Sequence, residues 1–374
     1  MIAGILKEPV GEKRVSLLPE QAETLVKKNV TVRIEQQAGV NAFADDAAYS
    51  SRSVGISSRA ELLDASDIIF TLNTIPEYEI KHLKKDTVLI GAFQPLYHRD
   101  LMEKYAAAGI TVFSLDMLPR TTRAQTMDVL SSQANIAGYK AVLLASNIYS
   151  RYMPMLMTAA GSIAPAKVLV LGAGVAGLQA IATSRRLGAV VEVFDTRPAV
   201  KEEVMSLGAK FIEVDGAADA SSAGGYAVEQ SEAYKQKQQQ KIAECIGRAD
   251  IVITTAQIPG KRAPVLITET MLQSMRKGAV VVDIAAATGG NTPVTKNNET
   301  VLYHGVTIAG NSNLPSTMPA DASKLYGKNL LNFLALIVDK EGKLLLNFDD
   351  ELVNGACICH EGQIVNERYM SMLQ

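Results

Sequence analysis

Short apolar runs, many of them rich in valine and isoleucine, recur along the chain between longer segments with helical periodicity. Buried parallel strands have this length and β-branched content. Strands that alternate with helices form parallel sheets covered by helices on both faces. We therefore predict an α/β fold of two doubly wound parallel-sheet domains. The expected strands are Ile2–Leu6, Thr31–Glu35, Asp67–Leu72, Thr87–Ala92 and Ile110–Leu115 in the first domain, and Lys167–Leu171, Ala189–Phe194, Lys210–Val214, Asp250–Thr254, Ala279–Ala285 and Val306–Ile308 in the second.

Two long helices are expected to connect the domains. The first runs from about Asp128 to Tyr149, starts with a carboxylate that favours a helix N-terminus, and leads into the second domain. The second starts at Asp321 as its N-cap, ends near Val338, and has an apolar stripe that predicts packing on the first domain. The predicted domains are 1–136 plus 320–374 and, between these segments, 137–319, with a cleft between them. After residue 342 we expect a hairpin-like tail with strands at 343–347, 356–359 and 363–365.

The second domain opens with a glycine fingerprint. Three glycines follow the apolar strand Val168–Leu171 at the spacing G-x-G-x-x-G, at positions Gly172, Gly174 and Gly177. The first glycine allows a tight turn, the second lets the backbone approach a diphosphate, and the third lets the next helix pack closely on the strand. That helix directs its N-terminus at the phosphates. The pattern predicts a Rossmann domain that binds a dinucleotide.

An acidic residue follows at the position expected for ribose recognition. The strand Ala189–Phe194 ends at Asp195, 18 positions beyond Gly177, where an acid of this fold accepts hydrogen bonds from the adenosine ribose. A carboxylate there repels a 2′-phosphate, which favours NAD(H) over NADP(H). Arg197 is a residue type that accommodates NADP(H) and weakens this preference slightly.

Composition excludes several classes of protein. The 374 residues are 48% hydrophobic and 20% charged with a net charge of −2, and they contain no basic block that suits nucleic acid or an anionic membrane. Three cysteines are too few for a disulfide framework, and Cys357-Ile-Cys359-His360 has no second ligand pair for zinc. We expect no bound metal, no signal peptide and no membrane span. Met153–Met157 is interpreted as irregular packing.

Two polar segments are candidate functional loops. Met117–Asp128 is polar and rich in turn residues. Residues 215–225 are small, polar and glycine-containing, which predicts a mobile loop. From the residues alone, each also has a structural interpretation: Arg120 and Asp128 as an ion pair between domains, and Tyr226 as a loop anchor.

Several longer motifs resemble one family, the proton-translocating NAD(P)+ transhydrogenases, and specifically the NAD(H)-binding domain of the alpha subunit. The likeness covers essentially the whole chain. The chain reaches Gln374 without a hydrophobic span, which is similar to the split form of the family. The motifs are Lys7-Glu8 with Arg14-Val15, Pro119-Arg120 with Arg123-Ala124-Gln125, Asn135-Ile-Ala-Gly-Tyr139, Val170-Leu-Gly-Ala-Gly-Val-Ala-Gly177, Phe194-Asp-Thr-Arg-Pro198 and Thr254-Thr-Ala-Gln-Ile-Pro-Gly-Lys261.

The resemblance implies roles for individual residues. Arg120 and Asp128 would hold the nicotinamide carboxamide and ring, and Gln125 would reach toward the NADP(H) partner; these three are the catalytic candidates. Tyr226 would fold over the bound nucleotide. The full set of residues expected to bind NAD(H) is Arg120, Gln125, Asp128, Ser131, Gly172, Ala173, Gly174, Val175, Ala176, Gly177, Asp195, Thr196, Arg197, Gly225, Tyr226, Ala256 and Gln257.

The resemblance also implies an activity and partners. The domain would pass a hydride from NADH directly to NADP+ held on a separate domain, and a membrane domain would couple this exchange to proton movement. We expect a homodimer that is cytoplasmic and peripheral on the inner face of the bacterial membrane, with NADP(H)-binding and membrane-spanning subunits as partners.

Alanine dehydrogenase is the nearest alternative, because it shares the fold and framework. Interconversion of a carbonyl and an amine needs acid–base groups and a cation for the substrate carboxylate. Residues 70–77 contain no lysine, Gln94 stands where a histidine is expected, and Ala287 stands where an acid is expected. Hydride exchange between two nicotinamides needs neither acid nor base. The sequence therefore favours transhydrogenation, and a non-catalytic NAD-sensing subunit is the third hypothesis.

Overall fold

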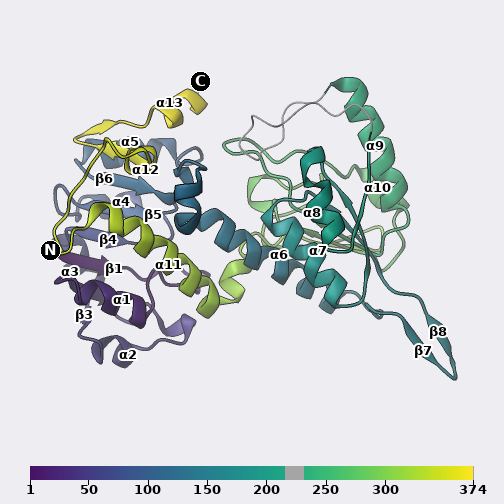
Figure 1. The fold of residues 1–374 in the computed structure, drawn as a ribbon, viewed down its shortest axis with the longest axis horizontal. Coiled ribbons are helices and arrows are strands. Elements are labelled where there is room, and N and C mark those ends of the chain that lie inside the picture. Colours follow the sequence, from purple (N-terminus) through teal and green to yellow (C-terminus); the bar gives the residue numbers. More distant parts are fainter. Residues whose placement is uncertain (215–230, 374) are drawn as a thin grey trace. The chain divides into compact units, whose positions relative to one another are not determined.

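The computed structural model describes residues 1–214 and 231–373. The chain divides into two compact units (Figure 1). Unit 1 comprises Met1–Gln133 and Ser316–Gln374, and unit 2 comprises Ala134–Pro315. Each unit is an α/β layer structure, as predicted, and each is described by itself below.

Unit 1 is built on a mostly parallel sheet with the order β17-β16-β6-β5-β4-β1-β2-β3 among its described residues. From β3 to β6 all strands are parallel, whereas β16 runs antiparallel to both β6 and β17. The strand order changes direction between β1 and β4. The strands are β1 (Ile2–Ile5), β2 (Thr31–Glu35), β3 (Gly55–Ser57), β4 (Ile68–Phe70), β5 (Val88–Gly91), β6 (Thr111–Ser114), β16 (Cys357–His360) and β17 (Gln363–Ile364).

Both faces of this sheet are covered, because its central strands are apolar at successive positions. In β4, Ile68 and Phe70 enter one core and Ile69 enters the other. Two opposite apolar faces require helices on both sides. The helices are α1 (Pro19–Val26), α2 (Asp46–Ser50), α3 (Arg59–Ala65), α4 (Glu77–Ile80), α5 (Arg99–Ala107), α11 (Pro319–Ile337), α12 (Glu351–Ala356) and α13 (Glu367–Leu373).

Unit 2 has the strand order β11-β10-β9-β12-β13-β15-β14 among its described residues. The first six of these are parallel and correspond to the Rossmann order 3-2-1-4-5-6, which confirms the predicted fold. The antiparallel β14 extends the edge beside β15. The strands are β9 (Lys167–Leu171), β10 (Val190–Phe194), β11 (Lys210–Phe211), β12 (Ile251–Thr254), β13 (Val280–Asp283), β14 (Thr300–Tyr303) and β15 (Val306–Ala309).

The helices of unit 2 cover both faces of its sheet. Ile181 of α7 packs in one core and Ile246 of α9 in the other. A separate two-stranded sheet, β7 (Leu156–Thr158) with β8 (Gly161–Ile163), extends away from the rest of unit 2 (Figure 1). The helices are α6 (Val129–Ile148), whose first turn belongs to unit 1, and α7 (Val175–Arg186), α8 (Lys201–Ser206), α9 (Glu232–Ile246) and α10 (Glu269–Ser274).

Three local expectations are wrong. The helix α11 is capped at Met318 and begins at Pro319, so Asp321 lies inside its first turn. Proline at N1 fixes the helical φ, and the N-cap lies at Met318, three residues before Asp321. Within 343–347 the structure has one isolated bridge, Val338 to Leu344, in place of a strand. The segment Met153–Met157 leads into the β7–β8 hairpin and is not merely irregular.

Across the described residues, no helix is long and apolar enough to span a membrane. Within the same ranges, no group of three or more His, Cys, Asp or Glu side chains is placed to hold a metal ion. The three cysteines are buried free thiols.

Candidate functional site

The glycine fingerprint forms the turn from β9 into α7. Gly172 has φ +102°, in the left-handed region that favours glycine. A Cβ on Gly177 would lie 1.9 Å from the carbonyl oxygen of Gly172, so only glycine allows the helix to lie this close to the turn. A Cβ on Gly174 would meet no protein atom within 4 Å. The backbone at Gly174, which is the N-cap of α7, therefore faces open space and fits a diphosphate at the helix N-terminus.

A second helix packs against the same turn at Gly138 of α6. A Cβ at Gly138 would lie 2.0 Å from the carbonyl oxygen of Ala176 in the fingerprint. The absence of a side chain at Gly138 therefore lets α6 pack directly against the first turn of α7. This contact supports the turn. Gly138 and Ala176 lie 38 positions apart in the sequence, and no sequence pattern predicted this contact.

Asp195 at the end of β10 is tied to the fingerprint. Its Oδ2 accepts a 2.7 Å hydrogen bond from the backbone N–H of Ala173, which joins the ends of the adjacent parallel strands β9 and β10. Arg197 forms an ion pair with the same carboxylate, with 2.7 Å between Nη2 and Oδ2. Thr196, between them, is half-buried. The acid and the phosphate-binding turn therefore lie at one end of the sheet.

The segment after β12 forms the other side of this sheet end. The hydroxyl of Thr255 donates to the carbonyl of Gly172 at 3.2 Å, so the Ala256–Gln257 backbone follows directly beside the fingerprint. Gln257 donates to the carbonyl oxygen of Ile284 at 3.4 Å. Because β9 and β12 flank the point where the strand order reverses, this is where open α/β sheets bind ligands.

Asn291 is a residue of this region that the sequence reasoning missed. Its side-chain N–H groups donate to the carbonyls of Ala256, at 2.9 Å, and Pro264, at 2.8 Å, and its side chain is fully buried. Its own backbone N–H donates to Oδ2 of Asp283 at 2.6 Å. Asp283 is fully buried and also accepts from Thr295 and Ala285. Like Asp195, Asp283 is an acid that ends an apolar strand, and this shared pattern is the signal that could have indicated it.

In unit 1, the residues expected near the nicotinamide lie on one continuous segment. Arg120 is exposed, Gln125 is exposed within the 3-10 helix Thr122–Met127, and Asp128 directly precedes α6. The Asp128 carboxylate accepts from the backbone N–H of Ser131 at 2.8 Å and from its hydroxyl at 2.6 Å. Asp128 is therefore an N-cap, as its placement predicted.

This segment is anchored by α11. The side-chain amides of Asn329 and Asn332 each donate to the carbonyl oxygen of Thr126 at 2.8 Å. Arg123, on the same 3-10 helix, forms an ion pair with Asp350. These contacts come from residues about 200 positions away, and they fix the backbone on which Gln125 is carried.

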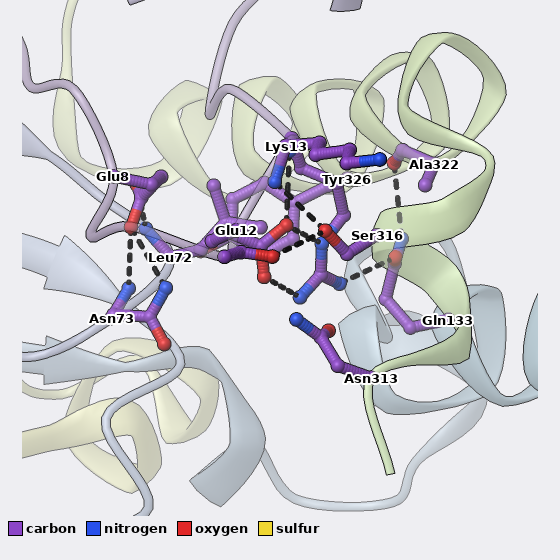
Figure 2. A network of polar contacts seen from close by, with 12 residues as sticks. Glu8, Glu12, Lys13, Leu72, Asn73, Gln133, Asn313, Ser316, Ala322 and Tyr326 are labelled. Carbon is purple, nitrogen blue, oxygen red and sulfur yellow. Dashed lines mark hydrogen bonds and ion pairs between the residues drawn. The ribbon is translucent and has the colours of Figure 1, made fainter. Parts of the chain in front are cut away.

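A separate polar cluster lies where the strand order of unit 1 reverses, between β1 and β4 (Figure 2). Glu8 follows β1, and its oxygens accept from the backbone N–H of Leu72 at 2.6 Å and from the side-chain amide of Asn73 at 2.9 Å. The hydroxyl of Thr71 donates at 3.0 Å. Burial raises the pKa of Glu8 to about 7, although these hydrogen bonds lower it.

The same cluster contains a charged pair (Figure 2). Arg14 donates to both oxygens of Glu12, at 2.8 and 2.7 Å, and to the side chain of Gln133 at 2.8 Å. Burial raises the pKa of Glu12, but the hydrogen bonds and the positive charge of Arg14 lower it by more. The pKa of Glu12 therefore lies below its ordinary value. Glu12 therefore loses its proton at a lower pH than the nearby Glu8 does.

The predicted site residues fall into two groups. Arg120, Gln125, Asp128 and Ser131 belong to unit 1, whereas Gly172–Gly177, Asp195–Arg197 and Ala256–Gln257 belong to unit 2. Gly225 and Tyr226, on the segment expected to be mobile, lie outside the described residues.

Comparison with known proteins assigns both halves of the chain. Residues 4–137 match the alanine dehydrogenase/PNT N-terminal domain, and residues 141–367 match the alanine dehydrogenase/PNT C-terminal domain. The chain is similar to the first of the parts that form the NAD(P) transhydrogenase alpha subunit of Rhodospirillum rubrum, with 46% identity over 95% of both chains. A transhydrogenase structure from Sinorhizobium meliloti matches with a TM-score of 0.89 and 42% identity, covering 98% of this chain and 100% of the other.

Alanine dehydrogenases are more distant relatives. That of Staphylococcus saprophyticus is 28% identical, over 91% of this chain and 88% of its own length. The higher identity and nearly complete coverage favour the transhydrogenase side of the family. The chain therefore belongs to the alanine dehydrogenase/PNT family and, within it, to the NAD(P) transhydrogenase alpha subunits of the split form, as their first component.

Proposed function

We propose that this chain binds NAD(H) and passes a hydride between NADH and NADP+ held by a partner subunit. The observation that carries the proposal is the arrangement at the end of β9, where the open backbone of Gly174 lies beside Asp195. An exposed helix N-terminus suits the diphosphate, and the acid suits the adenosine ribose. Thr196, Arg197 and the Ala256–Gln257 backbone would complete the adenosine half.

The nicotinamide end is assigned to the segment of unit 1 that carries Arg120, Gln125 and Asp128. Bound NADH supplies the hydride, and the reaction needs no general acid or base from the protein. The protein groups have to hold the ring in one orientation and keep water away. Arg120 and Asp128 would bind the carboxamide, Ser131 would keep Asp128 in place, and Gln125, which is exposed, would face the partner.

An amino-acid dehydrogenase is the alternative of a different class. No observation favours it, because the positions where its acid–base groups are expected hold Gln94 and Ala287. The alanine dehydrogenase relative is also the more distant one, at 28% identity.

The proposal includes partners and a location. The other subunits would be an NADP(H)-binding subunit and a membrane-spanning subunit that couples hydride transfer to proton translocation. The chain would then lie on the cytoplasmic side, peripheral to the inner face of the bacterial membrane. The match to the first component of a divided alpha subunit supports this view, because such a component implies further ones.

We also expect a homodimer, and the hairpin of β7 and β8 supports it. Met155 and Met157 are 62% and 74% exposed, and Tyr152 just before them is 53% exposed. A two-stranded hairpin without a core is marginally stable alone, so an apolar one gains by packing on another chain. Light scattering should give the mass of a dimer, and Met157→Lys should shift the equilibrium toward monomer.

The activity is tested by measuring hydride transfer with the purified chain, with and without a recombinant NADP(H)-binding transhydrogenase domain. Reduction of an acetylpyridine analogue of NAD+ by NADH, through the partner's NADP(H), should require both proteins. Pyruvate with ammonia is the parallel substrate. Steady NADH oxidation with pyruvate by the chain alone would overturn the proposal, and NADH binding without transfer to any partner would indicate a sensing subunit.

A further inference from the structure

Asp195 and Arg197 form a two-point ion pair at the position expected to meet the adenosine ribose. Arg197 Nε donates to Oδ1 of Asp195 at 2.9 Å, and Nη2 donates to Oδ2 at 2.7 Å. The side chain of Asp195 is 5% exposed and that of Arg197 is 18% exposed, so water screens the pair weakly. Pro198 follows directly and holds the backbone of Arg197 extended, at φ −96° and ψ 108°.

The carboxylate has no acceptor position left. A carboxylate offers about four lone-pair sites. Two of these accept the guanidinium, one accepts the backbone N–H of Ala173 at 2.7 Å, and one accepts the backbone N–H of Arg197 at 2.8 Å. A ribose hydroxyl can reach Asp195 only by replacing a donor, and the side chain of Arg197 is the donor that can leave without breaking the turn.

The ribose diol of NAD(H) and the 2′-phosphate of NADP(H) would interact differently with the Asp195–Arg197 pair. The two hydroxyls of NAD(H) can replace the guanidinium, since they donate to the carboxylate as it did. A 2′-phosphate has no proton to donate at neutral pH and is repelled by Asp195. It would bind Arg197, whose planar guanidinium matches phosphate oxygens, but only if that side chain were released.

We propose that Arg197 is a latent 2′-phosphate ligand that Asp195 withholds, so that the pair, and not the acid alone, excludes NADP(H) from this subunit. The inference rests on the proposed NAD(H) function. It predicts that neutralising Asp195 creates affinity for the 2′-phosphate, and that this new affinity depends on Arg197.

The test measures binding of ADP-ribose, 2′-phospho-ADP-ribose and NADH by calorimetry. The variants are Asp195→Asn, Arg197→Met and the double variant. Asp195→Asn should weaken ADP-ribose and strengthen the 2′-phosphorylated probe, each by about tenfold or more, as expected for a charge-assisted hydrogen bond. The double variant should lose this gain. Asp195→Ser repeats the comparison with a smaller neutral side chain.

A matched control uses a second arginine–carboxylate pair, whose acid lies in β10, the strand that Asp195 follows. Arg248 donates to both oxygens of Glu192 in β10, at 2.9 and 2.7 Å. Glu192→Gln should leave the preference between the two probes unchanged. Thermal unfolding of every variant reports whether it folds.

Two results would overturn the inference. One is a folded Asp195→Asn and Asp195→Ser pair that gains no affinity for 2′-phospho-ADP-ribose. The other is an equal gain in the single and double variants, which would assign the exclusion to repulsion by Asp195 alone. If the wild-type chain bound neither NADH nor ADP-ribose, the proposed function would fail instead, so the two failures are distinct.

Discussion

The backbone N–H of Leu72 donates a 2.6 Å hydrogen bond to Oε1 of Glu8, and this contact joins the ends of β1 and β4 across the reversal point of unit 1. Further donors to this carboxylate come from the adjacent residues Thr71 and Asn73, so one short segment after β4 surrounds it. Ionised Glu8 is the better acceptor, but burial opposes its charge. The fold therefore binds a proton here more tightly than the unfolded chain does.

The first prediction follows from this proton. The pKa of Glu8 rises from 4.5 to about 7 on folding, so the unfolded chain loses its proton first as pH increases. This group's contribution to stability is complete below pH 4.5, falls between pH 4.5 and 7, and is then constant. Between these pH values, the contribution of Glu8 to the free energy of unfolding falls by about 3 kcal/mol in total. Chemical unfolding of wild type and Glu8→Gln between about pH 4.5 and 8 measures it.

The variant should show a smaller decline over this range, because glutamine does not titrate. Glu77, whose side chain is 65% exposed, gives the matched control, and Glu77→Gln should keep the wild-type profile. Parallel pH profiles for wild type and Glu8→Gln would show that Glu8 does not hold a proton near neutral pH.

Two glycines of the fingerprint should respond differently to alanine. Gly177→Ala forces a Cβ against the backbone oxygen of Gly172 and should destabilise the fold by about 2–4 kcal/mol. Gly174→Ala adds a methyl group where no protein atom lies within 4 Å, so it should fold normally and weaken NADH binding. Thermal unfolding and NADH titration separate the effects. Unchanged NADH affinity in Gly174→Ala would exclude the diphosphate from that position.

Asn291 should support the binding segment without contacting the nucleotide. Asn291→Ala leaves the carbonyls of Ala256 and Pro264 without this donor, which should cost about 1–3 kcal/mol. Hydrogen exchange should accelerate across 256–264, and NADH affinity should fall. Asn297→Ala, at a position whose side chain accepts from Ser312, is the control and should leave exchange in 256–264 unchanged. The role is contradicted if 256–264 keeps its protection in Asn291→Ala.

The anchors of the 3-10 helix should affect transfer more than binding. Replacing both Asn329 and Asn332 by alanine removes both amides that fix the Thr126 carbonyl. We expect slower hydride transfer to the partner, because Gln125 loses its fixed position, while ADP-ribose affinity stays unchanged. Transfer kinetics with the NADP(H)-binding domain and calorimetry with ADP-ribose check this. A parallel loss of both would point to general destabilisation.

The ribose role of Asp195 has its own test. Asp195→Arg replaces the acceptor by a cation and should weaken NADH binding by about tenfold or more. Fluorescence titration with NADH measures the change, and Glu192→Gln in the preceding strand β10 is the control. Unchanged NADH affinity would refute the ribose role.

Much of the fold could be predicted because its signals are local. Buried parallel strands such as Lys167–Leu171 appear as short apolar runs that contain valine, and the glycines of the turn have a fixed spacing. Asp195 could be predicted as the ribose acid because it ends the next strand, 18 positions beyond Gly177. Short edge strands such as β3 and β14 were missed, because three or four partly exposed residues have no clear periodicity.

The supporting contacts could not be predicted, because they join distant segments of the chain. Asn291 reaches back 35 positions to Ala256, and Asn329 reaches 203 positions to Thr126. A single asparagine carries no pattern that reveals its partner. The pairing of Arg197 with Asp195 is local in sequence. Only the structure shows that the donors of Arg197 and Ala173 together occupy all acceptor positions of the Asp195 carboxylate.

The division of unit 1 into two segments has a consequence for biosynthesis. Unit 2 is one continuous stretch of chain and can fold as soon as it has left the ribosome, whereas unit 1 lacks β16 and α11 until its last segment, 316–374, has been made. In the interval, β6 has no antiparallel neighbour, and the apolar face that Phe333 of α11 covers stays exposed. The half-made chain is thus most vulnerable to aggregation in the unit whose synthesis started first.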